Sequence, residues 1–128
     1  MKRVLVLLVC AAVAAGPALA ARAPSAAEKR AITATVKGFY AYWWYYKPAG
    51  VPGLAVSKIR TSTVDAHWAA AEVHGPAAAG RPALFDRVLL WHSLRRWIVA
   101  DAPSSEFIGC GVAPPAVTRD LFRGLGGC

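Results

Sequence analysis

The sequence predicts an α+β domain in which an N-terminal helix packs on a four-stranded antiparallel meander and a short helix follows at the C-terminus. Three observations predict this fold. Apolar residues recur at helical spacing through residues 32–46. Short segments rich in β-branched and aromatic residues, with turn signals between them, follow from residue 54 to residue 101. A Pro-Pro pair then opens a second apolar segment. Strands joined by short links favour a meander, and one helix with an apolar face can cover one side of the sheet.

Residues 1–20 have the anatomy of a cleavable signal peptide. The positive start MKR precedes an apolar run over residues 4–15, and Ala18 and Ala20 place small side chains three and one positions before a cut. The run is shorter than the ~20 residues that a membrane-spanning helix needs. We therefore expect a secreted or periplasmic (extracytoplasmic) protein without a transmembrane segment after signal removal. Residues 21–128 are expected to form a single small domain.

The composition of the remaining chain indicates a basic protein from an oxidising compartment. Thirteen Lys and Arg stand against seven Asp and Glu in residues 21–128, a net charge of +6. This balance is typical of a soluble basic surface, or of attraction to anionic polymers and lipids of a cell envelope. Many Ala and Arg with few Lys indicate a bacterial source of high genomic GC content.

Two cysteines, Cys110 and Cys128, remain after signal removal. A disulfide between them, closing nineteen residues, is the favoured interpretation and would stabilise the fold by about 3 kcal/mol. A nucleophilic Cys110 beside a histidine is the alternative.

The first helix is predicted from its capping box and its apolar stripe. Ser25 and Glu28 have the spacing at which each side chain bonds the other's backbone amide. Pro48 ends the helix. The stripe predicted to face the core, at spacings of four and three, consists of Ile32, Val36, Phe39, Trp43 and Tyr46.

The strands are predicted at residues 54–62, 67–74, 83–92 and 96–101, with turns between them. The run from Val88 to Trp91 is apolar on both faces, which leaves the inward side of the sheet undecided. The short C-terminal helix is predicted over residues 116–122.

Three segments, TSTVDAHWA, RRWIVAD and GCGVAPPAVTRDLF, resemble a pattern in a family of uncharacterised small secreted or lipid-anchored bacterial proteins. The resemblance spans residues 54–122, and its C-terminal part has the form GCG-x-x-P-x-x-V-x-x-D-L. The layout of that family is similar to cystatin-like and nuclear-transport-factor-2-like folds, by analogy of architecture only. The chain departs from the family in its aromatic helix and in lacking a lipobox, because Val9 precedes Cys10 where a small residue is needed. The resemblance implies no catalytic residue.

Seven aromatic side chains crowd the eight residues 39–46. Because one face of a helix is core, the rings outside the stripe, Tyr42, Trp44 and Tyr45, are candidates for contact with a sugar, a peptide or a membrane interface. The alternative is that these rings cover a sheet edge or pack under the loop of residues 75–82.

The other candidate residues are basic, histidine and acidic side chains. Arg95 and Arg96 with Trp97, and Lys58 with Arg60, can form a basic and aromatic strip for an anionic polymer. A shared metal site of the three histidines is disfavoured, because His67 and His74 are an odd number of residues apart on one strand, although His67 and His92 can meet across strands. No carboxylate is evident beside them. Asp65 is expected to cap its turn, and Glu72 and Asp86 to pair with Arg87 or Arg60.

No motif of a serine hydrolase or a phosphate-binding loop occurs in the chain. We therefore predict a non-enzymatic exported module that binds an envelope protein, a glycan or an anionic polymer, without cofactor, metal or nucleic acid. Two alternatives stay open. One is a small envelope-associated enzyme with a cavity between helix and sheet, using His67 or His92 and a carboxylate. The other is a cystatin-like protease inhibitor.

Overall fold

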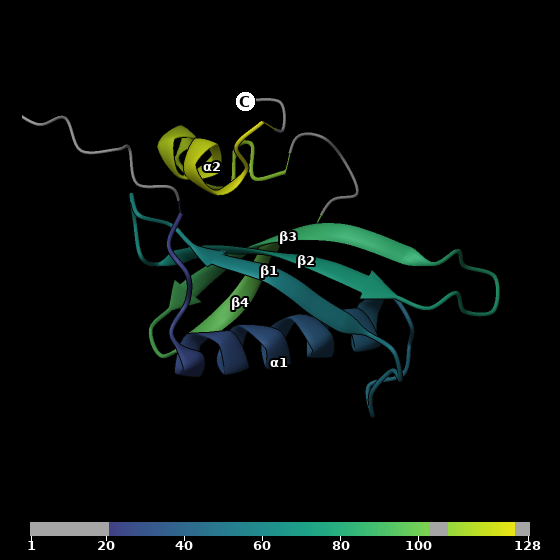
Figure 1. Ribbon diagram of the computed structural model, residues 1–128. Helices are drawn as coiled ribbons and strands as arrows, with labels where there is room; N and C mark the ends of the chain where they lie inside the picture. Colours follow the sequence, from purple (N-terminus) through teal and green to yellow (C-terminus); the bar gives the residue numbers. More distant parts are fainter. Residues whose placement is uncertain (1–20, 103–107, 125–128) are drawn as a thin grey trace, which may run out of the picture.

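Two helices cover opposite faces of one antiparallel sheet. The computed structural model describes residues 21–102 and 108–124. Its elements are α1 (Ala26–Trp43), β1 (Ala55–Thr61), β2 (Trp68–Gly75), β3 (Leu84–Ser93), β4 (Arg96–Asp101) and α2 (Pro115–Leu121). Helix α1 lies along one side of the sheet and α2 on the other (Figure 1). The predicted α+β architecture is confirmed.

The start of α1 is fixed by the capping box that the sequence predicts. The amide of Glu28 donates to Oγ of Ser25 at 3.1 Å, and the amide of Ser25 donates to Oε2 of Glu28 at 2.7 Å. Arg22 adds an ion pair to the same carboxylate at 2.8 Å. These bonds satisfy amides that have no partner within the helix.

The sheet has the strand order β1-β2-β3-β4, and every neighbouring pair is antiparallel. Each predicted strand end lies within one residue of the observed end. Turn residues and β-branched segments mark such ends locally, which is why the meander is predictable from sequence. A register shift between Ser57 and Arg60 bends β1, and Lys58 has a positive φ of 47° inside it.

The sheet is buried on both faces, and this explains the apolar run in β3. Val88 and Leu90 belong to the core on the α1 side, whereas Leu89 belongs to the core on the α2 side. Successive side chains of a strand point to opposite faces, so the part of a strand that a helix covers on each side needs apolar residues at consecutive positions. The sequence left undecided which face of the sheet is buried, and the structure shows that both faces are.

The segment of residues 109–121 attaches α2 to the sheet. Gly109 has a φ of +82°, and a Cβ there would lie 2.7 Å from Cγ2 of Thr118. Its amide donates to Oδ2 of Asp101 at 2.7 Å. Asp120 accepts from Oγ of Ser62 and the amide of Thr63, both at 2.8 Å. Gly109 and Asp120 therefore serve packing and anchoring.

Two predicted features lie outside the described residues. They are the signal peptide of residues 1–20 and Cys128, the predicted disulfide partner of Cys110. Within the described part of the chain, neither helix combines the length and apolar character needed to cross a membrane.

Candidate functional site

The aromatic segment at the end of α1 is oriented differently from the prediction. Trp43 and Tyr46, predicted to face the core, are 62% and 70% exposed. Tyr40 and Tyr45 are buried instead. The stripe of Ile32 and Val36 continues four residues on, at Tyr40, and α1 ends at Trp43, so helical spacing no longer applies beyond it. The prediction that Trp43 and Tyr46 face the core is therefore wrong.

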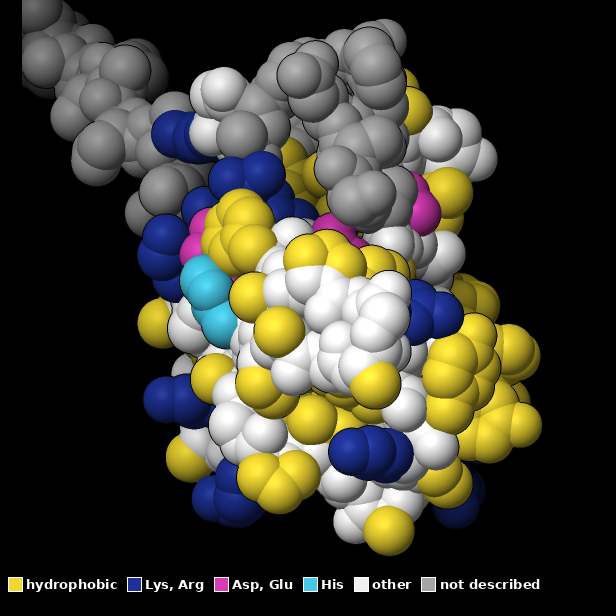
Figure 2. All heavy atoms as spheres, turned by 90° about the vertical axis from the view of Figure 1, so that its right-hand side faces the viewer, with side chains coloured by type: hydrophobic (Ala, Val, Ile, Leu, Met, Phe, Trp, Pro, Cys, Tyr) yellow, Lys and Arg dark blue, Asp and Glu magenta, His cyan; other side chains and the backbone are white. Residues whose placement is uncertain are grey.

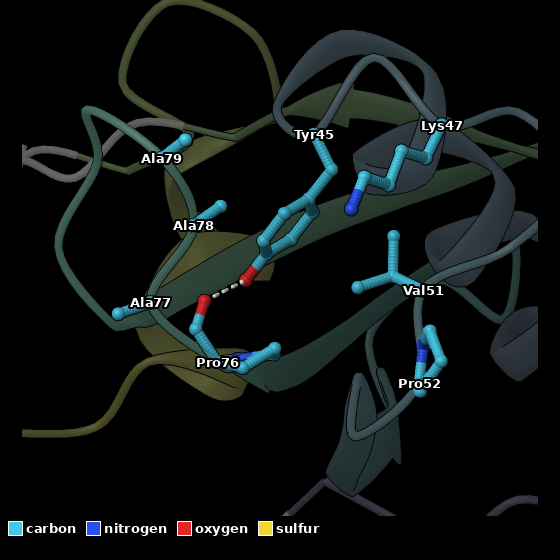
Figure 3. A pocket seen from close by; sticks show the side chains of 8 residues that line it. All are labelled: Tyr45, Lys47, Val51, Pro52, Pro76, Ala77, Ala78 and Ala79. Carbon is cyan, nitrogen blue, oxygen red and sulfur yellow. Dashed lines mark hydrogen bonds between the residues drawn. The ribbon is translucent and has the colours of Figure 1, made fainter.

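Tyr45 folds back against the loop that joins β2 to β3. A turn with a positive φ of 53° at Tyr46 follows it. The Tyr45 hydroxyl donates to the carbonyl oxygen of Pro76 at 2.9 Å, and the ring forms one wall of a pocket of about 390 Å³ that Lys47 also lines (Figure 3). The ring fits because Gly75 has no side chain, since a Cβ there would lie 2.0 Å from the hydroxyl. The prediction of Tyr45 as an outward ring is wrong, and the alternative, packing under the loop of residues 75–82, is confirmed.

Three large rings are left exposed where α1 ends, and we call Tyr42, Trp43 and Tyr46 the aromatic patch. Tyr42 is 55% exposed and meets Trp43 edge to face, with ring centroids 4.9 Å apart. Together with Pro48 the three rings line a pocket of about 280 Å³. Figure 2 faces this end of the molecule, and large hydrophobic side chains gather along one edge of it.

Arg81 connects the patch to the β2–β3 loop. Its guanidinium lies 4.8 Å from the ring centroid of Trp44 and 5.2 Å from that of Tyr46, and it donates to the Tyr46 hydroxyl at 3.2 Å. Trp44, a predicted binding residue, is half-buried, and its buried indole N–H has no hydrogen-bond partner among the described residues. Of the predicted binding rings, Tyr42 alone is exposed. The sequence prediction missed Trp43 because it placed the apolar stripe of the helix in the wrong phase, and it missed Tyr46 because it extended the helix beyond Trp43.

A third pocket opens between α1 and the sheet, and we call it the acidic pocket. Its volume is about 230 Å³. Four aromatic residues, one carboxylate and one alanine line it: Phe39, Tyr40, Trp43, Trp44, Asp86 and Ala102. It shares Trp43 with the aromatic patch. The pocket therefore combines aromatic walls with a single acidic group.

Asp86 is 6% exposed, and its two carboxylate oxygens accept one hydrogen bond each. The Tyr40 hydroxyl donates to Oδ2 at 2.5 Å, and the backbone amide of Arg87 donates to Oδ1 at 2.8 Å. Burial raises the pKa of Asp86, and the charge of Asp101 raises it further, while the bonds from Tyr40 and Arg87 oppose this rise. Burial, followed by the hydrogen bond to Asp86, also raises the pKa of Tyr40.

The predicted ion pair of Glu72 with Arg87 is present, at 3.8 Å. Lys58 adds a closer pair to Glu72 at 3.1 Å, and Nε2 of His74 lies 3.8 Å from the same carboxylate. The corresponding prediction for Asp86 is wrong, because its side-chain partners are Tyr40 and a backbone amide.

His67, in the turn just before β2, and His92 of β3 lie together as the sequence allows, with stacked rings whose centroids are 6.5 Å apart. A carboxylate is nevertheless present, because Oδ1 of Asp65 lies 2.8 Å from Nδ1 of His67. Asp65 caps its turn as expected, and hydrogen bonds from the backbone and then the ring of His67 lower its pKa. Among the described residues, no three side chains of the types that ligate metals form a group that could hold an ion. Neither His67 nor His92 lines any of the three pockets described above.

The basic strip does not form around Trp97. Arg95 and Arg96 are exposed at the β3–β4 hairpin, but Trp97 is buried in the core on the α1 side. Residues 96 and 97 point to opposite faces of β4, so Arg96 and Trp97 do not share a face. The charge of Lys58 is paired with Glu72. Trp97 therefore does not contribute to a surface strip, whereas binding by Arg95 and Arg96 stays a prediction.

In comparisons with known proteins, no family model, curated protein or solved structure matches the chain.

Proposed function

We propose that the protein is an exported binding module of the cell envelope or secreted fraction, and that the aromatic patch is its contact surface. The observation that carries this proposal is the exposure of three adjacent large rings, Tyr42, Trp43 and Tyr46, at one end of the molecule. Contiguous exposed aromatic groups mark interaction sites more often than isolated ones. Trp and Tyr are also the residues that dominate binding energy at interfaces.

The ligand class that fits the patch best is an envelope glycan. Tyr and Trp present flat apolar faces with polar tips, and a sugar ring presents a flat C–H face with hydroxyl groups at its rim. Arg81 stacks on Tyr46, and Lys47 is the next residue after Tyr46 in the chain. Positive charge therefore borders the patch. This charge favours a glycan that also carries anionic groups.

Co-sedimentation of purified protein with envelope fragments tests this function. We expect binding to persist above about 0.5 M NaCl, where salt screens attraction between exposed charges. The double variant Tyr42→Ser, Tyr46→Ser should lose this salt-resistant binding. Phe85→Ser is the matched control, because Phe85 is also an exposed ring but lies on the face of β3 opposite α1, which carries Arg87.

Protease treatment of the envelope fragments separates a glycan from a protein partner. Binding that survives digestion supports the glycan, and binding that disappears indicates an envelope protein. Release of all protein at low salt, or equal loss in the Phe85→Ser control, contradicts the patch as the contact surface.

Export through residues 1–20 and a Cys110–Cys128 disulfide belong to the same proposal. Mass spectrometry of protein recovered from the extracytoplasmic fraction should find Ala21 at the N-terminus and two hydrogens fewer than the reduced chain. Reduction should then lower the melting temperature. Retained residues 1–20, or two thiols that alkylate without reduction, contradict these two parts separately.

A small envelope-associated enzyme is the second candidate, and the acidic pocket favours it. A buried carboxyl with a raised pKa in a pocket is a common feature of acid–base sites. This candidate would use Asp86 rather than the histidines. Hydrolysis of envelope glycans by wild-type protein, with loss in Asp86→Asn, would support it over a binding module.

A further inference from the structure

The acidic pocket contains a buried carboxylate without a cationic partner. Among the described residues, no Lys, Arg or His side chain forms an ion pair with Asp86, although Arg87 is its neighbour in sequence. The Arg87 side chain lies on the other face of the sheet, where its Nε is 3.8 Å from Glu72 and its guanidinium covers the ring of Phe85. Both nearby hydrogen-bond donors to Asp86 are uncharged.

Glu72 shows the usual arrangement for a buried carboxylate in this sheet. It is buried to a similar extent as Asp86, and Lys58, His74 and Arg87 all lie within 4 Å of its oxygens. Burying an ionised group without an opposite charge is unfavourable, which is why such groups are ordinarily paired. Asp86 is therefore the buried carboxylate of the sheet whose counter-charge is missing.

The walls of the pocket are suited to a cation. Phe39, Trp43 and Trp44 line the pocket together with Asp86. Aromatic ring faces attract ammonium groups, most strongly where water is excluded. Each oxygen of Asp86 accepts one bond and keeps a second lone pair for another donor.

We infer that the acidic pocket binds an organic ammonium group, with Asp86 as the counter-charge and the rings of Phe39, Trp43 and Trp44 as its cage. This inference rests on the proposed function, because the pocket shares Trp43 with the aromatic patch and would take an ammonium substituent of the ligand held there. The ammonium group supplies the charge that the protein itself does not place beside Asp86.

Binding of this kind depends on pH. The groups that act on Asp86 are Tyr40 from α1, Asp101 from β4 and Arg87 on its own strand, while its partner on β2 is the apolar Val73. Asp86 must be ionised to attract an ammonium group, and its pKa in the free protein is raised. Affinity should therefore fall as the pH is lowered from 7, and binding should release protons wherever Asp86 of the free protein is partly protonated.

An NMR titration with two pairs of probes tests the inference. n-Butylammonium and glucosamine carry the ammonium group on an alkyl chain and on a sugar, and 1-butanol and N-acetylglucosamine are their uncharged counterparts. We expect the charged probes to shift the indole signals of Trp43 and Trp44, with at least tenfold weaker effects of the neutral ones. Binding of glucosamine alone indicates a ligand whose ammonium group is on a sugar. Binding of n-butylammonium alone indicates a ligand whose ammonium group is on an alkyl chain.

Asp86→Asn is the decisive variant, because it keeps the shape of the side chain. The amide oxygen can accept from the Arg87 amide, and the amide nitrogen can donate to the Tyr40 hydroxyl. We expect at least a tenfold loss of ammonium affinity. Asp65→Asn removes the same charge at an exposed turn and serves as the control, with affinity unchanged.

Three results overturn the inference: equal binding of charged and neutral probes, unchanged affinity in Asp86→Asn, or no binding of either ammonium probe. If Asp86→Asn does not fold, the pH dependence of wild-type affinity decides instead, and affinity independent of pH overturns it. Failure here is distinguishable from failure of the proposed function, because envelope binding that depends on Tyr42 and Tyr46 can persist without ammonium binding.

Discussion

The hydroxyl of Tyr40 donates a hydrogen bond to Oδ2 of Asp86 and so joins α1 to β3 beneath the acidic pocket. Both residues are buried, and they are 46 positions apart in the chain. A hydrogen bond to a charged acceptor is worth more than one between neutral groups. This contact therefore links the binding pocket to the stability of the fold, and both can be measured.

Tyr40→Phe removes the donor and leaves the carboxylate with one hydrogen bond fewer. We expect the free energy of unfolding at pH 7 to fall by about 1.5–3 kcal/mol, as for other bonds to charged groups. Urea denaturation of the variant measures the loss. The same substitution in an Asp86→Asn background should cost less, and an equal cost in both backgrounds would mean that the bond contributes little.

The raised pKa of Asp86 predicts how stability varies with pH. The folded-state pKa lies above the model value of 3.8, so the folded protein holds this proton more tightly than the unfolded chain. Its stabilising contribution is complete below pH 3.8 and is lost as the pH rises through the raised pKa. Asp86→Asn should lack this loss, so its stability relative to wild type should increase with pH. Parallel curves from urea denaturation at several pH values would contradict this expectation.

Glu28 gives the opposite dependence. Hydrogen bonds from Arg22 and then from Ser25 lower its pKa from 4.5 to about 2, against the opposing effect of burial. The stability that this shift represents is present above pH 4.5 and is lost as the pH falls toward 2. Thermal melts of Glu28→Gln should show a smaller loss of stability over this range than wild type. Lys29→Gln, a change at the neighbouring exposed residue, is the control.

Trp43 and Tyr45, two residues apart in the chain, should differ sharply in their effect on stability. Tyr45→Ala removes a buried ring and should cost about 3–5 kcal/mol, as other large-to-small core changes do. Trp43→Ala removes an exposed ring and should change stability by no more than about 0.5 kcal/mol. Chemical denaturation measures both values, and equal costs would mean that the aromatic segment is oriented differently.

Asp120→Ala tests the attachment of α2. The change leaves the Ser62 hydroxyl and the Thr63 amide without their acceptor and should cost about 1–3 kcal/mol. Arg119→Ala, at the exposed neighbour in the same helix, should cost much less. Hydrogen exchange at the Thr63 amide gives an independent measure, and unchanged protection in Asp120→Ala would contradict the anchoring role.

Local patterns in the sequence determine most of the fold. Ser25 and Glu28 are close enough in the chain for the capping box to be identified without a structure. Turn residues between β-rich segments define strands whose ends match within one residue. The Pro-Pro pair marks the start of α2, which begins at Pro115. These signals depend on neighbours a few residues away, so sequence alone contains them.

The candidate site depends on contacts between distant residues, and only the tertiary structure decides it. Tyr45 is buried because Gly75 and Pro76 leave room for its ring, and no helical periodicity encodes that contact. Glu72 and Asp86 are both acidic residues of the sheet, and the sequence predicts the same arginine partners for both. The Arg87 side chain points toward Glu72, so it pairs with Glu72 and not with Asp86. Which face a side chain occupies, and what the opposite element brings to it, follow from the packing of helices on a two-sided sheet.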